Sequence, residues 1–216
     1  GRLRFQKRWA QTPRIPETSV LGHMLTVAIF AYFFSIEVNA CDKRLQNNFF
    51  TALFHDLPEA LTRDIITPVK YCVDELSDII AEYEIEKIQE DILPNIPDIL
   101  HDEFSYILGL YDGVKEEFAN KIYEDKILLV DDVSKYNSDR YNAIDGHALK
   151  QCDKLSAFVE ASLSISHGIK SKELINGKKE ILKALKEVQG VDFKAIAMQI
   201  DYEFGTTGQT QVRMDF

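Results

Sequence analysis

The most constraining feature of this sequence is a charged pair, His55-Asp56, at the end of an apolar run that begins at Phe49. A buried carboxylate without a partner is costly, so such a pair needs a partner from elsewhere in the fold. Imidazole nitrogen and carboxylate oxygen both bind divalent transition metals. Glu59, one helical turn later, would stand beside such a metal as a general acid or base. Taken alone, the pair fits a helix-capping surface His-Asp equally well, so other residues must decide.

Length and composition indicate one globular domain. The 216 residues are 45% hydrophobic and 28% charged, which allows a substantial core and is too apolar for a disordered chain. The formal net charge of -10 argues against a binder of nucleic-acid polymers, which would show a basic patch. A small anionic substrate remains compatible, because a metal and one or two Arg side chains reverse the field locally.

The cysteines and the apolar runs bear on the cellular compartment. Cys41, Cys72 and Cys152 are odd in number and widely spaced, so we expect neither a disulfide framework nor a zinc knuckle. Residues 1–11 are basic and polar, without the apolar core of a signal peptide. The most apolar run, 24–36, is shorter than the about 20 residues of a membrane span and reads as a core helix. We therefore expect a cytoplasmic protein with no membrane partner.

Hydrophobic spacing predicts an all-α fold. The predicted helices cover residues 18–39, 43–55, 58–62, 73–91, 102–110, 146–167, 171–189 and 192–203. Thr18 and Ser19 are both plausible N-caps of the first helix and Ser171 of the helix over 171–189, for which Gly190 is a plausible stop. Residues 127–130 are too short a run for periodicity to separate strand from helix. With no linker in view, we expect one domain over 1–204 and a flexible tail over 205–216.

Three of these apolar helices carry residues that suit a metal. They are His23 in the first helix, His55 and Asp56 at the end of the second, and Asp153 in the helix over 146–167. Two imidazoles and two carboxylates suit one divalent ion, such as Mn, Co, Fe, Ni, Zn or Mg, with open positions for water and substrate. No thiol joins them, so a structural zinc site is not indicated. A His23 that never met His55 would be an ordinary core residue.

Further polar groups stand near these helices in the sequence. Arg8 next to Trp9, the only Trp, offers a phosphate fork and a flat stacking surface. The Thr67-Pro68 step disfavours helix and predicts an ordered loop. Asp64 begins the stretch that leads into this loop and would be presented to a ligand with it. We read His101, His147 and His167 as structural or surface residues.

Taken together, these residues resemble the HD-domain metal-dependent phosphohydrolases, and within them the branch of bacterial 5'-deoxynucleotidases. The resemblance extends from Arg8 to about Phe204. It is carried by Lys7-Arg8-Trp9, by residues 22–28, by residues 55–64 with Thr67-Pro68-Val69-Lys70, and by residues 145–157. An HD pair alone is weak evidence, whereas HD-x-x-E-x-x-x-x-D with the TPVK loop and the late DKLSA is specific.

The resemblance implies an all-α HD domain, a metal-dependent hydrolysis of (deoxy)ribonucleoside 5'-monophosphates, and a homodimer. The implied metal ligands are His23, His55, Asp56 and Asp153, with Glu59 as the acid/base group. The implied substrate contacts are Arg8 for the phosphate, Trp9 for the nucleotide pocket, Asp64 for the sugar hydroxyl, and Thr67 with Pro68 along that side.

Departures from the family pattern and three alternative functions remain. Gly22 stands directly before His23, where the family usually has Glu, which bears on metal affinity or substrate fit. The first alternative is another HD phosphohydrolase substrate, such as a cyclic nucleotide, a triphosphate or an alarmone; a basic triphosphate cluster near His55 is missing from the sequence. The second is a non-catalytic metal-binding module of a larger protein, against which Glu59 and Arg8 argue. The third is a plain helical scaffold.

Overall fold

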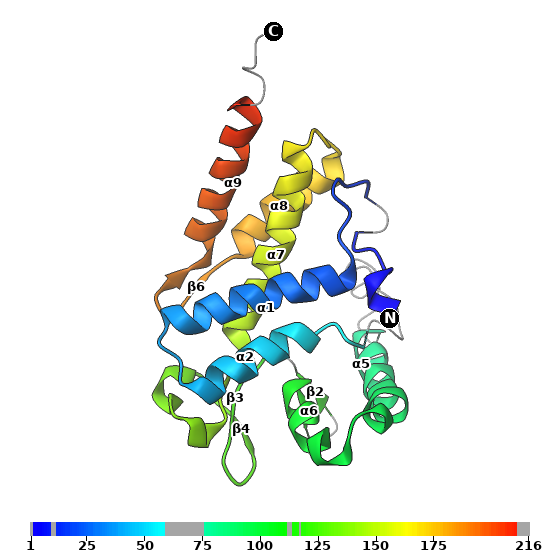
Figure 1. Ribbon diagram of the computed structural model, residues 1–216, viewed down its shortest axis with the longest axis vertical. Helices are drawn as coiled ribbons and strands as arrows, with labels where there is room; N and C mark the ends of the chain where they lie inside the picture. Colours follow the sequence, from blue (N-terminus) through cyan, green and yellow to red (C-terminus); the bar gives the residue numbers. More distant parts are fainter. Residues whose placement is uncertain (1, 10–11, 59–75, 112–113, 117, 211–216) are drawn as a thin grey trace.

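The computed structural model describes residues 2–9, 12–58, 76–111, 114–116 and 118–210. Over these ranges the protein is mostly helical, which confirms the predicted fold class. The long helices are α1 (Val20–Glu37), α2 (Asp42–Phe54), α5 (Leu76–Lys87), α7 (Gly146–Ser166), α8 (Lys172–Ala184) and α9 (Phe193–Thr210), with the short α6 (His101–Ile107). In Figure 1, α1 crosses in front of α7 and lies above α2, while α9 leads away toward the C-terminus.

The core forms where α1, α2, α7 and α9 meet. Small side chains on facing helices, such as Ala31 and Ala148, let the helices approach closely, and Phe34, Leu149 and Phe158 fill the space between them. Full burial of a side chain of this size contributes about 1.5–3 kcal/mol. This core packs α1, α2 and α7 against one another.

The ends of α1 and α2 place the candidate ligands. Ser19 caps α1 as predicted, because its hydroxyl accepts a hydrogen bond of 3.0 Å from the backbone N–H of Gly22. His23 therefore lies in the first turn of α1. At the other end of the site, α2 ends at Phe54 and His55 is its C-cap. The chain turns there, with the Leu57 N–H bonded to the Phe54 carbonyl at 2.9 Å.

Short strands complete the fold. β3 (Asn120–Tyr123) lies between β4 (Ile127–Leu129) and β5 (Ile144–Asp145), with antiparallel pairing on both sides. The run over 127–130, left open by the sequence, is thus mainly strand. The remaining strands form two hairpins, β1 (Leu110–Tyr111) with β2 (Val114–Lys115) and β6 (Glu187–Val188) with β7 (Val191–Asp192). Single turns of helix are Arg2–Arg4, Ile88–Ile92, Leu93–Asn95, Asp98–Leu100, Val133–Tyr136 and Asp139–Tyr141.

Two predicted helix ends differ from the structure. The helix predicted over 171–189 ends at Ala184, because Leu185 is extended and buried and the chain then forms the β6–β7 hairpin. Gln189 and Gly190 both have positive φ, 50° and 83°, at the turn of this hairpin. At the C-terminal end, α9 continues through Thr210, beyond the predicted end at 203. The division into a domain over 1–204 and a flexible tail stays a prediction.

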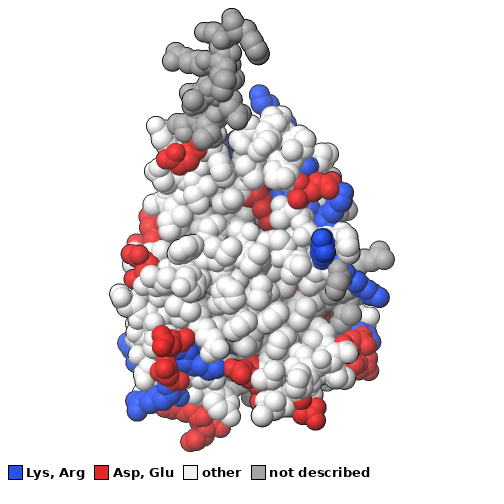
Figure 2. Space-filling view, in the orientation of Figure 1, with Lys and Arg blue, Asp and Glu red and all other residues white. Residues whose placement is uncertain are grey.

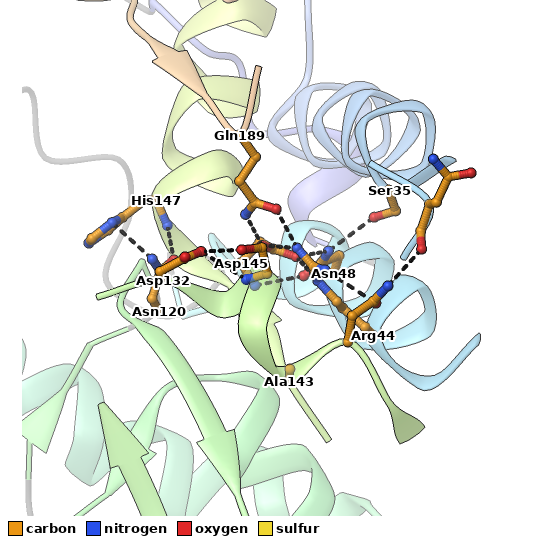
Figure 3. A network of polar contacts seen from close by, with 12 residues as sticks. Ser35, Arg44, Asn48, Asn120, Asp132, Ala143, Asp145, His147 and Gln189 are labelled. Atoms are coloured by element: carbon orange, nitrogen blue, oxygen red, sulfur yellow. Dashed lines mark hydrogen bonds and ion pairs between the residues drawn. The ribbon is translucent and has the colours of Figure 1, made fainter. Parts of the chain in front are cut away.

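A buried polar network joins α2 to the start of α7 (Figure 3). Arg44 donates through Nε and Nη2 to the two carboxylate oxygens of Asp145, each at 2.7 Å. Asn48 and Gln189 donate to the same carboxylate at 2.7 and 2.6 Å. Such a bidentate and fully bonded pair is well satisfied although buried. Nearby, His147 bonds to Asn120, which supports its reading as a structural residue.

The helix α1 is unusually apolar. Among the described residues it is the one helix long and apolar enough to cross a membrane, with a mean hydropathy of 1.6, and 44% of it is buried inside the protein. One such helix is weak evidence, since core helices of soluble proteins share these properties. Its exposed side, which we call the α1 face, consists of Leu21, Leu25, Ile29, Tyr32, Phe33 and Ile36.

Candidate metal centre and active site

Three helices bring the four predicted ligands together. Nε2 of His23 lies 2.9 Å from Oδ1 of Asp153, which joins α1 to α7. Nε2 of His55 lies 3.3 Å from Oδ2 of Asp56 and 4.0 Å from Oδ1 of Asp153, which joins the end of α2 to the same place. The alternative of a plain scaffold, in which His23 and Asp153 never meet His55, is therefore excluded. The role of these residues as metal ligands stays a prediction.

The donor set fits a divalent metal. One ligand atom each from His23, His55 and Asp56 lies within 4.8 Å of the others. Nδ1 of His55 donates to the Ala52 carbonyl at 2.7 Å, while its buried Nε2 makes no hydrogen bond within the described part of the chain. This arrangement is typical of metal-binding imidazoles, because the bond at one ring nitrogen orients the lone pair of the other. Both imidazoles are buried, whereas the Asp56 and Asp153 side chains are 18% and 29% exposed. Solvent therefore reaches the cluster from the side of its two carboxylates.

Charges inside the cluster shift the protonation of its members. Burial disfavours the charged form of His55, but the carboxylates of Asp56 and Asp153 outweigh it and raise the pKa of His55 to about 9. Burial acts to raise the pKa of Asp56, and the charges of His55 and Arg8 outweigh it and hold that pKa well below its usual range. In the metal-free protein, a proton on His55 thus balances the ionised carboxylates at neutral pH.

The N-terminal segment carries the predicted substrate residues to this cluster. Nη1 of Arg8 lies 3.2 Å from Oδ2 of Asp56, and the Arg8 N–H donates to the Thr18 carbonyl at 2.9 Å. Trp9 follows with a φ of 56°, a conformation that is costly for a bulky residue and that concentrates at functional sites. A cavity of about 230 Å³ lies here, lined by residues that include Arg8, Trp9 and Arg14. Cationic and aromatic groups therefore line a small cavity next to the cluster.

Two functional candidates were missed from the sequence, Glu160 and Arg14. Glu160 lies on α7 and is buried among partners from the N-terminal half. Its carboxylate accepts hydrogen bonds from Nδ1 of His23 at 2.9 Å, Nε1 of Trp9 at 3.0 Å and Nη1 of Arg14 at 3.2 Å. The sequence does contain a signal for Glu160, because a residue seven positions after Asp153 lies two turns along the same face of α7.

Burial acts to raise the pKa of Glu160, and the hydrogen bond from His23 with the charges of His23, Arg8 and Arg14 outweighs that effect. The pKa of Glu160 therefore lies below its ordinary value, and the group is an anion at neutral pH. An ionised carboxylate accepts hydrogen bonds on both oxygens, which matches the three donors around it.

Four predicted site residues, Glu59, Asp64, Thr67 and Pro68, lie outside the described residues. Their predicted roles as acid/base group and substrate contacts stay predictions.

The helical core brings two imidazoles and two carboxylates to one point, with an arginine beside them, and this donor set suits a divalent metal. The family model of the HD domain matches residues 1–208. The chain therefore belongs to the HD-domain family.

Similar proteins agree with this assignment. A 5'-deoxynucleotidase of Cronobacter sakazakii is 32% identical over 125 residues, which cover 54% of this chain and 60% of that protein. The 5'-deoxynucleotidase YfbR of Salmonella arizonae is 27% identical over 198 residues, which cover 89% of this chain and 84% of that protein. The chain thus spans about 60% of the length of the first of these relatives.

Two solved structures share the fold. An HD-domain phosphohydrolase from Listeria innocua superposes with a TM-score of 0.64 at 19% identity, covering 97% of this chain and 94% of that one. The cyanophage S-2L HD phosphohydrolase, bound to dA and one catalytic Zn²⁺, superposes with a TM-score of 0.51 at 15% identity and the same coverage. At these identities the comparison establishes the common fold.

Proposed function

We propose that this chain is a metal-dependent phosphohydrolase that cleaves deoxyribo- or ribonucleoside 5'-monophosphates into nucleoside and phosphate. The observation that carries the proposal is the convergence of His23, His55, Asp56 and Asp153 on one point, with Arg8 directly beside it. Relatives named 5'-deoxynucleotidases and a nucleoside-bound, Zn²⁺-containing neighbour support the substrate class.

In this proposal the four ligands hold one divalent ion among Mn, Co, Fe, Ni, Zn or Mg. Such an ion supplies Lewis-acid stabilisation of the charge that develops on the phosphoryl group and makes water more acidic. Arg8 binds the phosphate through its planar fork. Trp9 packs along the nucleotide, and Asp64 with Thr67 and Pro68 contacts the sugar side.

Glu59 completes the reaction as the acid/base group. It takes a proton from the water molecule that attacks phosphorus and passes it to the leaving nucleoside oxygen as the P–O bond breaks. This role requires a carboxylate that stands beside the metal without binding it. We therefore expect Glu59→Ala to lose most turnover while it keeps the metal.

The test is phosphate release from a panel of deoxyribo- and ribonucleoside 5'-monophosphates, with Mn²⁺, Co²⁺, Zn²⁺, Mg²⁺ or a chelator. Wild-type protein is compared with Asp56→Ala and with Asp98→Ala, a control at a fully exposed carboxylate. We expect release that needs the metal, disappears in Asp56→Ala and persists in Asp98→Ala. No release from any monophosphate by metal-loaded wild-type protein would overturn the proposal and favour another phosphorylated substrate or a binding module.

We also propose that the chain forms a homodimer through the α1 face. The six exposed hydrophobic residues of this face follow one side of α1, and Figure 2 shows few charges over the centre of this side of the molecule. Contiguous apolar surface of this kind marks interaction sites, and one helix face is self-complementary about a two-fold axis. We expect a dimer in sedimentation velocity for the wild type and a monomer for Leu25→Glu with Phe33→Glu. A monomeric wild type would refute this proposal.

A further inference from the structure

The buried carboxylate of Glu160 connects the metal cluster to the N-terminal segment that carries Trp9 and Arg14, here called the substrate segment. Oε1 of Glu160 accepts the hydrogen bond from Nδ1 of His23, while Oε2 accepts those from Nε1 of Trp9 and Nη1 of Arg14. The two oxygens of one side chain thus serve two different parts of the site. The backbone of α7, which also carries Asp153, holds this carboxylate in place.

The bond from Nδ1 of His23 to Glu160 orients that imidazole toward the cluster, together with the Ser156 hydroxyl, which lies 3.1 Å from the same nitrogen. With Nδ1 donating to Glu160, Nε2 faces Oδ1 of Asp153, 2.9 Å away, and its lone pair becomes available to a metal that replaces the proton between these two atoms. A carboxylate behind a ligating imidazole fixes the tautomer and the ring orientation and makes the ligand more basic. Gly22, directly before His23, has no side chain with which to supply such a carboxylate.

The bonds on the other oxygen hold the substrate segment. Trp9 has a costly backbone conformation with φ at 56°, so its position depends on tertiary contacts such as the bond to Glu160. The side chain of Arg14 is buried and lies over the Trp9 ring at 5.6 Å, and its Nε and Nη2 have no hydrogen-bond partner among the described residues. Glu160 is therefore the carboxylate that balances this buried guanidinium.

We propose that Glu160 is a positioning residue that orients His23 for the metal and, through its second oxygen, holds Trp9 and Arg14 at the substrate cavity. Metal binding and the placement of Trp9 are then linked, because both depend on the same carboxylate. The consequence for nucleotide binding rests on the proposed function. The link between metal binding and the placement of Trp9 exists in the protein before any substrate binds.

Glu160→Gln tests this link sharply. The amide has one accepting oxygen and one donating nitrogen, so it satisfies either His23 or the pair Trp9 and Arg14, but not both. Glu180→Gln is the matched control, because it removes a carboxylate that is 70% exposed on α8. The probe is Zn²⁺ alone, titrated by competition with a chelator and by the emission of Trp9, the only Trp in the chain.

For the wild type and Glu180→Gln, we expect Zn²⁺ to change the Trp9 emission with the same Kd that chelator competition gives. For Glu160→Gln we expect a Kd raised about 10- to 100-fold and no Zn²⁺-dependent emission change. Glu160→Asp, which keeps the charge, should recover part of both. A folded Glu160→Gln that binds Zn²⁺ like the wild type would overturn the proposal.

If Glu160→Gln does not fold, the wild-type titration decides, since Trp9 emission that is insensitive to bound Zn²⁺ also overturns the proposal. None of these readouts needs nucleotide or turnover. Failure of phosphate release would therefore overturn the proposed function alone, and an absent link between Zn²⁺ and Trp9 would overturn this inference alone.

Discussion

The Arg44–Asp145 pair offers a direct test of how the site is held together. Asp145 is fully buried directly before α7, and Arg44 is 1% exposed on α2. Asp145→Asn keeps the shape of the side chain and removes its charge. It leaves the Arg44 guanidinium buried without a counter-charge and puts a donating NH₂ group where an oxygen accepted hydrogen bonds.

The expected loss follows from the contacts. Four donor atoms, two from Arg44 and one each from Asn48 and Gln189, converge on the two oxygens of Asp145, and an amide offers only one accepting oxygen. Breaking a buried pair from one side costs about 3–5 kcal/mol. For a chain of this length, about 2–4 °C per kcal/mol converts this loss into a Tm lowered by roughly 6–20 °C.

The assay is urea unfolding followed by far-UV circular dichroism, with thermal unfolding alongside. Asp98→Asn, at a fully exposed carboxylate, should stay within about 0.5 kcal/mol of the wild type. The double variant Arg44→Met with Asp145→Leu removes both charges and should be more stable than Asp145→Asn alone. A free energy of unfolding for Asp145→Asn within about 1 kcal/mol of the wild type would refute the reasoning.

Three further predictions concern the metal, the phosphate and the start of α7. Because the pKa of His55 is raised to about 9, a proton competes with the metal below that pH. The apparent affinity for the metal should therefore fall about tenfold for each pH unit below the pKa, or ~100-fold by pH 7. A metal affinity that does not change with pH in chelator competition would contradict this. Arg8→Lys keeps the positive charge and loses the planar guanidinium that can form two parallel hydrogen bonds to a phosphate. The KM for nucleoside monophosphates should therefore rise about tenfold with the metal still bound. An unchanged KM would show that Arg8 does not bind the phosphate. Gly146→Ala would place a Cβ against the Ala119 carbonyl. It should lower the free energy of unfolding, measured in urea, by about 1–3 kcal/mol. An unchanged free energy of unfolding would show that the backbone at Ala119 can move aside at no cost.

The sequence by itself determined the helical class, because apolar spacing such as that of Val27, Ala31 and Phe34 follows the helical period along α1. Its capping signal at Ser19 also predicted where α1 begins. The residue types of His23, His55, Asp56 and Asp153 pointed to a metal because imidazole and carboxylate on apolar helices need a partner. Periodicity and residue chemistry are local properties, so a linear reading suffices for them.

Tertiary structure alone decided which partners these residues have. Helix α8 ends at Ala184, because Leu185 is buried and Gln189, at the turn of the following hairpin, donates a hydrogen bond to Asp145. Neither contact can be predicted from the residues that neighbour them in the sequence. Glu160 serves His23 and Trp9 only because α7 passes beside the start of α1 and the N-terminal segment. Likewise, the adjacent Asp56 chiefly raises the pKa of His55, and Asp153 adds to that rise although it lies 98 residues away in the sequence. Packing over such separations depends on the whole core, and electrostatic interactions follow distance in space rather than in sequence.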